Sequence, residues 1–197
     1  MILGLTGAFG GGKSTVLQFF AQRNWYVFDA DAVCRDIYAE MPAELETFLL
    51  TAFGKEVFNA DRSLNRQLIA AATFDKPELM KELTSILYPL LTAKMHHAAT
   101  LCRKNRKHGI FELPLLYEAG FENLFDRVLA LWCDPAVRVE RLKQRNYDAA
   151  EMRRRDARQL APEAKLTKAD YGVINNGSRE LLMLQLEKIA AELENME

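Results

Sequence analysis

Apolar residues along the chain fall into short runs and into longer segments with helical periodicity. Residues 2–5 form an apolar run that ends in glycines, and Val16, Phe19 and Phe20 then recur at helical spacing. This order predicts a strand, a glycine loop and a helix, which is the start of an α/β fold. Further short runs have the character of strands buried on both faces, at residues 25–28, 110–113, 127–132 and 171–174.

A long segment without a strand signal lies between the second and third predicted strands. It covers about eighty residues, and its leucines and isoleucine between residues 79 and 90 fall on one face of a helix. We therefore expect an all-helical insertion. The same spacing recurs over residues 182–193, where Ser178 is placed to cap the helix. This last helix is expected to pack on the sheet.

Composition narrows the class of protein. Of 197 residues, 49% are apolar and 27% are charged, which is typical of a globular protein and excludes a disordered or fibrous chain. The net charge of -1 provides no overall electrostatic attraction for a nucleic acid. No apolar stretch reaches the ~20 residues that a membrane span needs. Met1 is followed by an apolar segment without a basic n-region or a small-residue cleavage site, so we expect no leader segment. Cys34, Cys102 and Cys133 form no disulfide or zinc pattern. We expect free thiols, a cytoplasmic location, and neither nucleic acid nor membrane as a partner.

The strongest chemical motif is a phosphate-binding loop. Residues 7–14 read GAFGGGKS, a full match to G-x-x-x-x-G-K-[ST] between a predicted strand and a predicted helix. The glycines let successive backbone N–H groups converge on the phosphates of a nucleotide. Lys13 adds a positive charge, Ser14 is placed to bind Mg²⁺, and the following helix offers its positive N-terminus. The motif predicts binding of a nucleoside triphosphate.

The phosphate loop alone leaves open a kinase, a GTPase switch or another ATPase. The guanine-reading motif N-K-x-D has only a near match at residues 167–170, which follow no buried strand, and D-x-x-G is absent. These features disfavour a GTPase.

Two carboxylates follow the second predicted strand, at Asp29 and Asp31. In open α/β sheets ligands bind at this end of the strands. A carboxylate there can orient an acceptor hydroxyl and take up its proton during phosphoryl transfer. We favour this role for Asp31, with the alternative that Asp31 caps a helix that begins near Ala32.

A basic helix follows the fourth predicted strand. Arg138, Arg141 and Arg145 share one of its faces; Asp134 is placed to pair with Arg138, and Asp148 with Arg145. Arg141 has no acidic neighbour on that face. A triphosphate between Arg141 and Arg145 would relieve their repulsion.

The segment that begins with these arginines is basic as a whole. Residues 138–158 contain eight Lys and Arg against four Asp and Glu. Such a segment suits a lid that closes over phosphates and excludes water. For residues 153–155 alone, a solvated charged hairpin is an equally good interpretation.

Six motifs in a fixed order resemble the dephospho-CoA kinase family over about residues 2–178. The motifs are GLTGAFGGGKST, FDADAV, LNRQLI, LPLLYE, RLKQRN and KADYGVINNGS. The resemblance implies a P-loop three-layer α/β/α fold with a five-stranded parallel sheet, a helical substrate-binding insertion and a helical lid. It also implies Mg²⁺ and ATP as cofactors, and phosphorylation of the ribose 3′-hydroxyl of dephospho-CoA in the last step of CoA synthesis.

The same resemblance divides the chain into three parts. The P-loop core is expected at residues 1–32, 108–137 and 166–197. The CoA-binding domain is expected at residues 33–107, and the lid at residues 138–165. It makes no prediction about oligomeric state.

The resemblance also assigns the family's site residues to individual positions of this sequence. The resemblance implies catalytic roles for Asp31, Lys13, Arg141 and Arg145. It assigns ATP binding to Gly10, Gly11, Gly12, Lys13, Ser14, Thr15 and Asn176. It assigns dephospho-CoA binding to Asp31, Arg66 and Leu115, and Mg²⁺ binding to Ser14 and Glu112.

The chain departs from the family at Glu112, where many members have Asp, and at three further positions. Tyr88 stands where the family has His, and Asn146 and Asn175 stand where it has Asp. Two alternatives stay open: a kinase of the same fold for another nucleotide or small alcohol, and a non-catalytic ATP-binding module. The combination of Asp31 with the lid arginines argues against the module, because a sensor needs no acceptor base.

Overall fold

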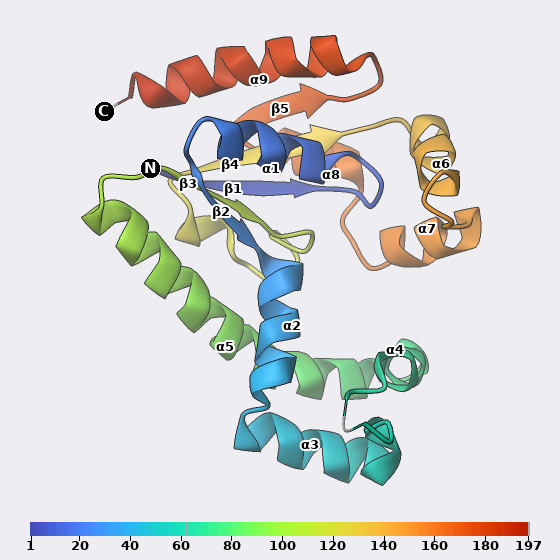
Figure 1. The fold of residues 1–197 in the computed structure, drawn as a ribbon. Coiled ribbons are helices and arrows are strands. Elements are labelled where there is room, and N and C mark those ends of the chain that lie inside the picture. The colour runs from blue at the N-terminus through green and yellow to red at the C-terminus, as the bar shows by residue number, and fades with distance from the viewer. Residues whose placement is uncertain (62, 197) are drawn as a thin grey trace. The chain divides into compact units, whose positions relative to one another are not determined.

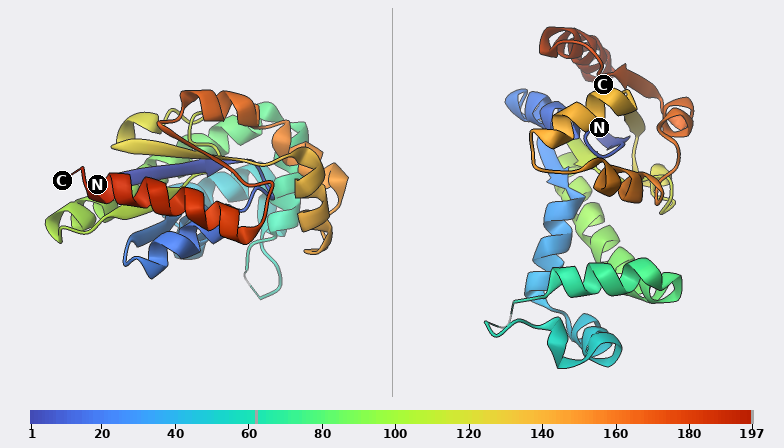
Figure 2. Two further views of the ribbon diagram at one scale, coloured as in Figure 1. Left: turned by 90° about the horizontal axis from the view of Figure 1, so that it is seen from above. Right: turned by 90° about the vertical axis from the view of Figure 1, so that its right-hand side faces the viewer.

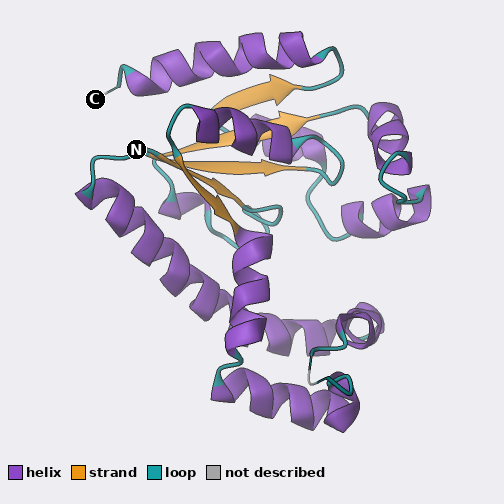
Figure 3. Cartoon of the chain, in the orientation of Figure 1, coloured by secondary structure: helices purple, strands orange, loops and turns teal. Residues whose placement is uncertain are grey.

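The structure is a computed structural model that describes residues 1–61 and 63–196. The chain forms two compact units, one made of Met1–Asp29 and Ala98–Glu197, the other of Ala30–His97. Figure 3 shows that strands belong to the first unit and that the second is built from helices. The boundaries expected from the sequence for the CoA-binding domain and the lid remain a prediction.

A five-stranded parallel sheet organises the first unit. Its strands are β1 (Ile2–Gly7), β2 (Tyr26–Asp29), β3 (Gly109–Glu112), β4 (Arg127–Trp132) and β5 (Tyr171–Ile174), which confirms the five predicted strands. They are ordered β2-β3-β1-β4-β5 (Figure 1), and every neighbouring pair is parallel. All carboxyl ends therefore lie at one edge of the sheet.

Helices cover both faces of this sheet. Helices α1 (Lys13–Gln22) and α9 (Arg179–Glu194) lie on one face, and α8 (Pro162–Lys168) lies on the other (Figures 1 and 2). The core under α1 and α9 includes fully buried Leu5 and Phe20. Burial of such a side chain stabilises the fold by about 1.5–3 kcal/mol.

The predicted basic segment forms two short helices, α6 (Pro135–Lys143) and α7 (Ala149–Asp156). The pairs expected for Asp134 and Asp148 are wrong, because both carboxylates cap helices. Asp134 accepts from the N–H of Ala136 at 2.7 Å, and Asp148 from the N–H of Glu151 at 2.6 Å. Each carboxylate satisfies a backbone donor that the helix start leaves unpaired. The same role predicted for Ser178 at the start of α9 is confirmed.

The second unit is helical, as predicted for the insertion. Its elements are α2 (Ala30–Glu40), α3 (Ala43–Phe53), the 3₁₀ helix η1 (Gly54–Val57), α4 (Arg66–Asp75) and most of α5 (Pro77–Lys104). One isolated antiparallel bridge between Phe58 and Leu64 was not predicted. The start of α2 at Ala30 places Asp31 inside the first turn, so the alternative of an N-cap at Asp31 is wrong.

The expectation of cysteines without disulfides is met, because Cys34, Cys102 and Cys133 form none. The first unit also contains a second 3₁₀ helix, η2 (Glu122–Leu124). Among the described residues, no helix is long and apolar enough to cross a membrane.

Candidate active site

The glycine loop connects β1 to α1 at the carboxyl edge of the sheet. Gly10 and Gly12 have φ angles of 78° and 102°, a left-handed conformation that favours glycine. A Cβ atom on Gly10 would collide with the side chain of Leu142, and one on Gly12 with the amide of Asn175. Glycine thus permits both the turn and the close approach of later segments. No side chain caps α1, and such a helix start attracts an anion.

Lys13 is the first residue of α1, and its ammonium group folds back over the loop. Its Nζ donates to the carbonyl oxygens of Gly7 at 2.9 Å and Ala8 at 3.2 Å, and lies 3.5 Å from Glu112 Oε1. Glu112 ends β3, next to β1 in the sheet. The structure therefore brings together the lysine that is predicted to bind phosphate and the carboxylate that is predicted to bind Mg²⁺.

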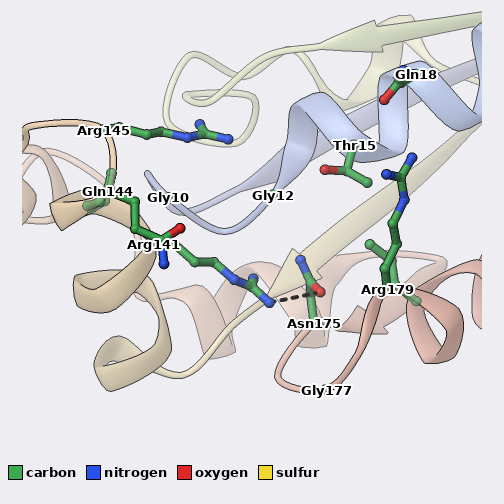
Figure 4. A pocket seen from close by; sticks show the side chains of 12 residues that line it. Gly10, Gly12, Thr15, Gln18, Arg141, Gln144, Arg145, Asn175, Gly177 and Arg179 are labelled. Atoms are coloured by element: carbon green, nitrogen blue, oxygen red, sulfur yellow. Dashed lines mark hydrogen bonds between the residues drawn. The ribbon is translucent and has the colours of Figure 1, made fainter.

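A cavity of about 260 Å³ opens beside the loop (Figure 4). It is lined from three places in the chain: the loop with α1, the end of α6, and the turn before α9 with its first residues. The lining includes three cationic side chains, Arg141, Arg145 and Arg179. The lining residues in the described part of the chain include no Asp or Glu. Positive charge concentrated around backbone N–H groups favours a polyanionic ligand.

The segment that carries Arg141 and Arg145, made of α6, α7 and the turn between them, is attached to the glycine loop. Arg138 is 2% exposed, donates to both carboxylate oxygens of Asp156 at 2.9 and 2.8 Å, and also donates to the carbonyl oxygen of Phe9 at 3.2 Å. The Phe9 ring meets the Tyr147 ring edge to face at 5.1 Å, and the Arg155 guanidinium lies 4.1 Å from the centre of the Phe9 ring. The bidentate ion pair thus joins α6 to α7, and the hydrogen bond and the cation–π contact to Phe9 join both helices to the loop.

The turn after β5 contributes two asparagines with different placements. Asn176, predicted to bind ATP, is exposed, and its Oδ1 accepts from the backbone N–H of Asp134 at 2.8 Å. Asn175 is buried and lines the cavity. In the sequence, Asn175 is notable only as a departure from the family pattern. Its position directly after β5 and beside the glycine loop was not visible from the motif.

The remaining predicted residues of the first unit lie at the same edge of the sheet. Ser14 and Thr15 are in the first turn of α1, and Ser14 is exposed. Leu115 is half-buried in the turn after β3. Lys165 fixes this turn, because its Nζ donates to Pro114 O at 2.5 Å and pairs with Glu118 at 2.9 Å. Burial lowers the pKa of Lys165, although the Glu118 carboxylate opposes this effect.

The groups predicted for Mg²⁺ fit that ion. The Ser14 hydroxyl and the Glu112 carboxylate are hard oxygen donors, and no group of three or more His, Cys, Asp or Glu in the described residues is arranged as a metal site. Mg²⁺ characteristically takes few protein ligands and shares its coordination with water and substrate phosphates. A small oxygen donor set beside a phosphate loop suits this behaviour.

The second unit contains its own cavity, of about 730 Å³. Arg66 lines it together with Lys55, Tyr38 and apolar side chains that include Leu50 and Phe58. Burial raises the pKa of Tyr38 to about 12, so its hydroxyl stays a neutral hydrogen-bonding group. Glu46 also lines this cavity, so its apolar walls are combined with two cations and one carboxylate. The remaining positive charge suits an elongated ligand that carries an anionic group.

Asp31 also belongs to the second unit. Its side chain is exposed in the first turn of α2, two residues after the end of β2. In the sheet, Asp29 at the end of β2 is in register with Glu112.

A phosphate loop between the first strand and first helix of this parallel sheet, faced by arginines from a later helix, defines a P-loop kinase. The model of the dephospho-CoA kinase family matches residues 1–180. The chain therefore belongs to the dephospho-CoA kinase family. It is an enzyme of an ATP-dependent kinase family, with dephospho-CoA kinase activity in CoA biosynthesis.

Individual proteins agree with this assignment. A dephospho-CoA kinase from Corynebacterium efficiens is 35% identical over 196 residues, which cover 97% of this chain and 96% of that protein. A crystal structure from Thermus thermophilus, TT1252, superposes with a TM-score of 0.83 at 29% identity, and covers 98% of this chain and 97% of that one. The dephospho-CoA kinase from Campylobacter jejuni has the same fold, with a TM-score of 0.75 at 24% identity over 99% of this chain and 98% of that one.

Proposed function

We propose that the chain transfers the γ-phosphoryl group of ATP to the ribose 3′-hydroxyl of dephospho-CoA, which yields CoA and ADP. The observation that carries this proposal is the cavity in which the glycine loop meets Arg141 and Arg145, lined by no carboxylate among the described residues. A triphosphate supplies the negative charge that such a lining requires. The apolar and cationic cavity of the second unit supports an acceptor with a long arm.

On the donor side, backbone N–H groups of Gly10 to Thr15 surround the phosphates. Lys13 exchanges its contacts with the Gly7 and Ala8 carbonyls for phosphate oxygens. Arg141 and Arg145 stabilise the charge that develops on the transferred group. Asn176 contributes to the ATP site indirectly, because its hydrogen bond with Asp134 connects the start of α6 to the turn after β5.

The Ser14 hydroxyl and the Glu112 carboxylate would hold Mg²⁺. When bound, the ion neutralises phosphate charge during transfer. Lys13, which lies 3.5 Å from Glu112, keeps this carboxylate oriented at the phosphate end of the site.

On the acceptor side, Asp31 takes up the proton of the 3′-hydroxyl as the bond to phosphorus forms. Arg66 binds an anionic group of dephospho-CoA, and the neighbouring apolar walls hold the pantetheine arm. Leu115 offers an apolar contact in the turn after β3. Binding energy from the arm orients the hydroxyl for in-line attack.

We further propose that the enzyme works in the cytoplasm on small molecules only, without nucleic acid or membrane partners. Three free thiols suit a reducing compartment. The near-zero net charge gives no general attraction for polyanionic macromolecules.

Product analysis tests the proposal. The full chain is incubated with Mg-ATP and dephospho-CoA, AMP, adenosine or shikimate, and ADP release is followed in a coupled assay. Phosphorus NMR then locates the new phosphate. We expect fast turnover only with dephospho-CoA and a phosphate on the 3′ oxygen. Transfer to AMP or shikimate at comparable efficiency, without formation of CoA, would refute the acceptor assignment.

A further inference from the structure

Asn175 occupies the contact between the glycine loop and the arginine-bearing helix α6. Its side chain is 5% exposed. The amide nitrogen Nδ2 donates to the carbonyl oxygen of Gly11 at 2.8 Å, and the amide oxygen Oδ1 accepts from Arg141 Nη2 at 3.4 Å (Figure 4). One buried amide thus links the two groups that flank the cavity.

The backbone of Asn175 is also fixed, so the amide has a defined position. Its N–H donates to the carbonyl oxygen of Trp132 at 2.9 Å, and its carbonyl accepts from the thiol of Cys133 at 3.2 Å. Gly12 packs so closely against Nδ2 that a Cβ at residue 12 would collide with it. The amide therefore has little freedom to rotate or withdraw.

This chain has Asn175 where the family pattern has Asp, and the amide matches both of its neighbours here, whereas a carboxylate would match only Arg141. An amide presents a donor at one end and an acceptor at the other, which matches the Gly11 carbonyl and the Arg141 guanidinium. A carboxylate offers no proton to Gly11 and would form an ion pair with Arg141. The second partner of Arg141, Cys133 Sγ at 3.4 Å, is a thiol whose pKa is raised by burial. Both described partners leave the charge of Arg141 uncompensated.

We propose that Asn175 is a positioning residue for ATP: it holds the Arg141 guanidinium beside the glycine loop without neutralising it. This inference rests on the proposed role of the cavity in ATP binding. Arg141 then meets the phosphates with its full charge and in a fixed place, which lowers the reorganisation needed when ATP binds. Asn175 acts through Arg141 and the loop, on the donor side of the reaction.

A double-mutant cycle tests this role. The dissociation constant of ATP is measured by calorimetry for the full chain, for Asn175→Asp, for Arg141→Ala and for the double variant. The KM values of ATP and dephospho-CoA are measured in the same proteins. Asn105→Asp is the matched control, because it makes the same chemical change in an exposed turn before β3, at the other edge of the sheet. Thermal melting reports whether each variant is folded.

We expect Asn175→Asp to weaken ATP binding about 10-fold, because its carboxylate neutralises Arg141 and repels the Gly11 carbonyl and the phosphates. The KM of dephospho-CoA should stay within about twofold. In the Arg141→Ala background the same change should cost less than about threefold, since much of its effect passes through Arg141. Asn105→Asp should match the wild type. If Asn175→Asp does not fold, Asn175→Ala carries the test, with a smaller expected loss of ATP affinity.

Equal losses in both backgrounds, equal changes in the KM of both substrates, or unchanged ATP affinity would overturn the inference. These results are distinguishable from failure of the proposed function. If Lys13→Ala abolishes turnover while the Asn175 variants behave as wild type, only the inference fails. If Lys13→Ala keeps full turnover, the ATP site itself is assigned wrongly and the inference falls with it.

Discussion

The two cavities of this chain differ in what surrounds the ligand. The cavity at the glycine loop is small, about 260 Å³, and combines backbone groups with Arg141, Arg145 and Arg179. The cavity of the second unit is larger, about 730 Å³, and combines apolar walls with Lys55 and Arg66. The first suits a compact polyanion and the second a long, mostly uncharged arm.

The way each cavity is built also differs. The first depends on backbone conformation, because Gly10 and Gly12 adopt left-handed φ angles and contact later segments directly. The second depends on side chains from helices and the loop around the Phe58–Leu64 bridge. Substitutions in the first should therefore affect the chemical step and ATP, and substitutions in the second should affect the affinity for dephospho-CoA.

The largest effect is expected for Lys13→Ala. In the proposed mechanism the lysine stabilises charge on the transferred group, from a position in which its ammonium group contacts the carbonyls of Gly7 and Ala8. We expect kcat to fall about 10²–10³-fold. The coupled ADP assay measures kcat, and an unchanged melting temperature serves as the control. Turnover within tenfold of wild type would contradict the assignment of the loop.

Asp31→Asn should lower kcat about 10²-fold, because the amide cannot accept the proton of the acceptor hydroxyl. The dissociation constant of ATP should be nearly unchanged, since Asp31 acts on the acceptor. Calorimetry with ATP and steady-state kinetics with dephospho-CoA measure the two quantities. Loss of ATP binding with surviving turnover would assign Asp31 to the metal site or to the fold.

Arg141→Ala and Arg145→Ala should each lower kcat about 10–100-fold, more than they raise the KM of dephospho-CoA. The reason is that the guanidinium groups meet charge that grows during transfer. Steady-state kinetics with both substrates varied provides the comparison. Unchanged kinetics in both variants would return residues 138–158 to the solvated-hairpin interpretation.

Arg66→Ala tests the second cavity. We expect the KM of dephospho-CoA to rise about 10-fold, with the KM of ATP within about twofold, because one charged contact to the acceptor is lost. Lys55→Ala is a second probe of the same cavity, from the 3₁₀ helix. An equal rise in the KM of ATP would show that the cavities do not divide the substrates between them.

The smallest effect is expected for a reducing agent. Cys102 and Cys133 are buried, Cys34 is half-buried, and none of the three forms a disulfide. The melting temperature should therefore be the same with and without dithiothreitol, as scanning calorimetry can measure. A melting temperature that falls on reduction would reveal a disulfide and contradict this prediction.

Much of the fold was predictable because its signals are local. Apolar runs marked all five strands, and Ser178 was correctly placed as a cap. The phosphate loop was visible because the chemistry fixes residue type and spacing over residues 7–14.

Contacts between distant residues were harder to predict. Arg138 pairs with Asp156, eighteen positions away, rather than with nearby Asp134, whose carboxylate is used by the backbone of α6. Asn175 is 164 positions from Gly11, and only the parallel sheet brings them together. The cavity wall around Arg66 is formed by the loop near Phe58, which has no periodic pattern.

The central claim is that one cavity binds ATP and the other binds the pantetheine arm of dephospho-CoA. The most direct test compares acceptors with and without this arm. The measurement is kcat/KM for dephospho-CoA against AMP, with Mg-ATP as donor and the same full-length protein. We predict that dephospho-CoA exceeds AMP by about 10³-fold or more, because binding energy from the arm orients the hydroxyl. Equal kcat/KM values for the two acceptors would contradict the account.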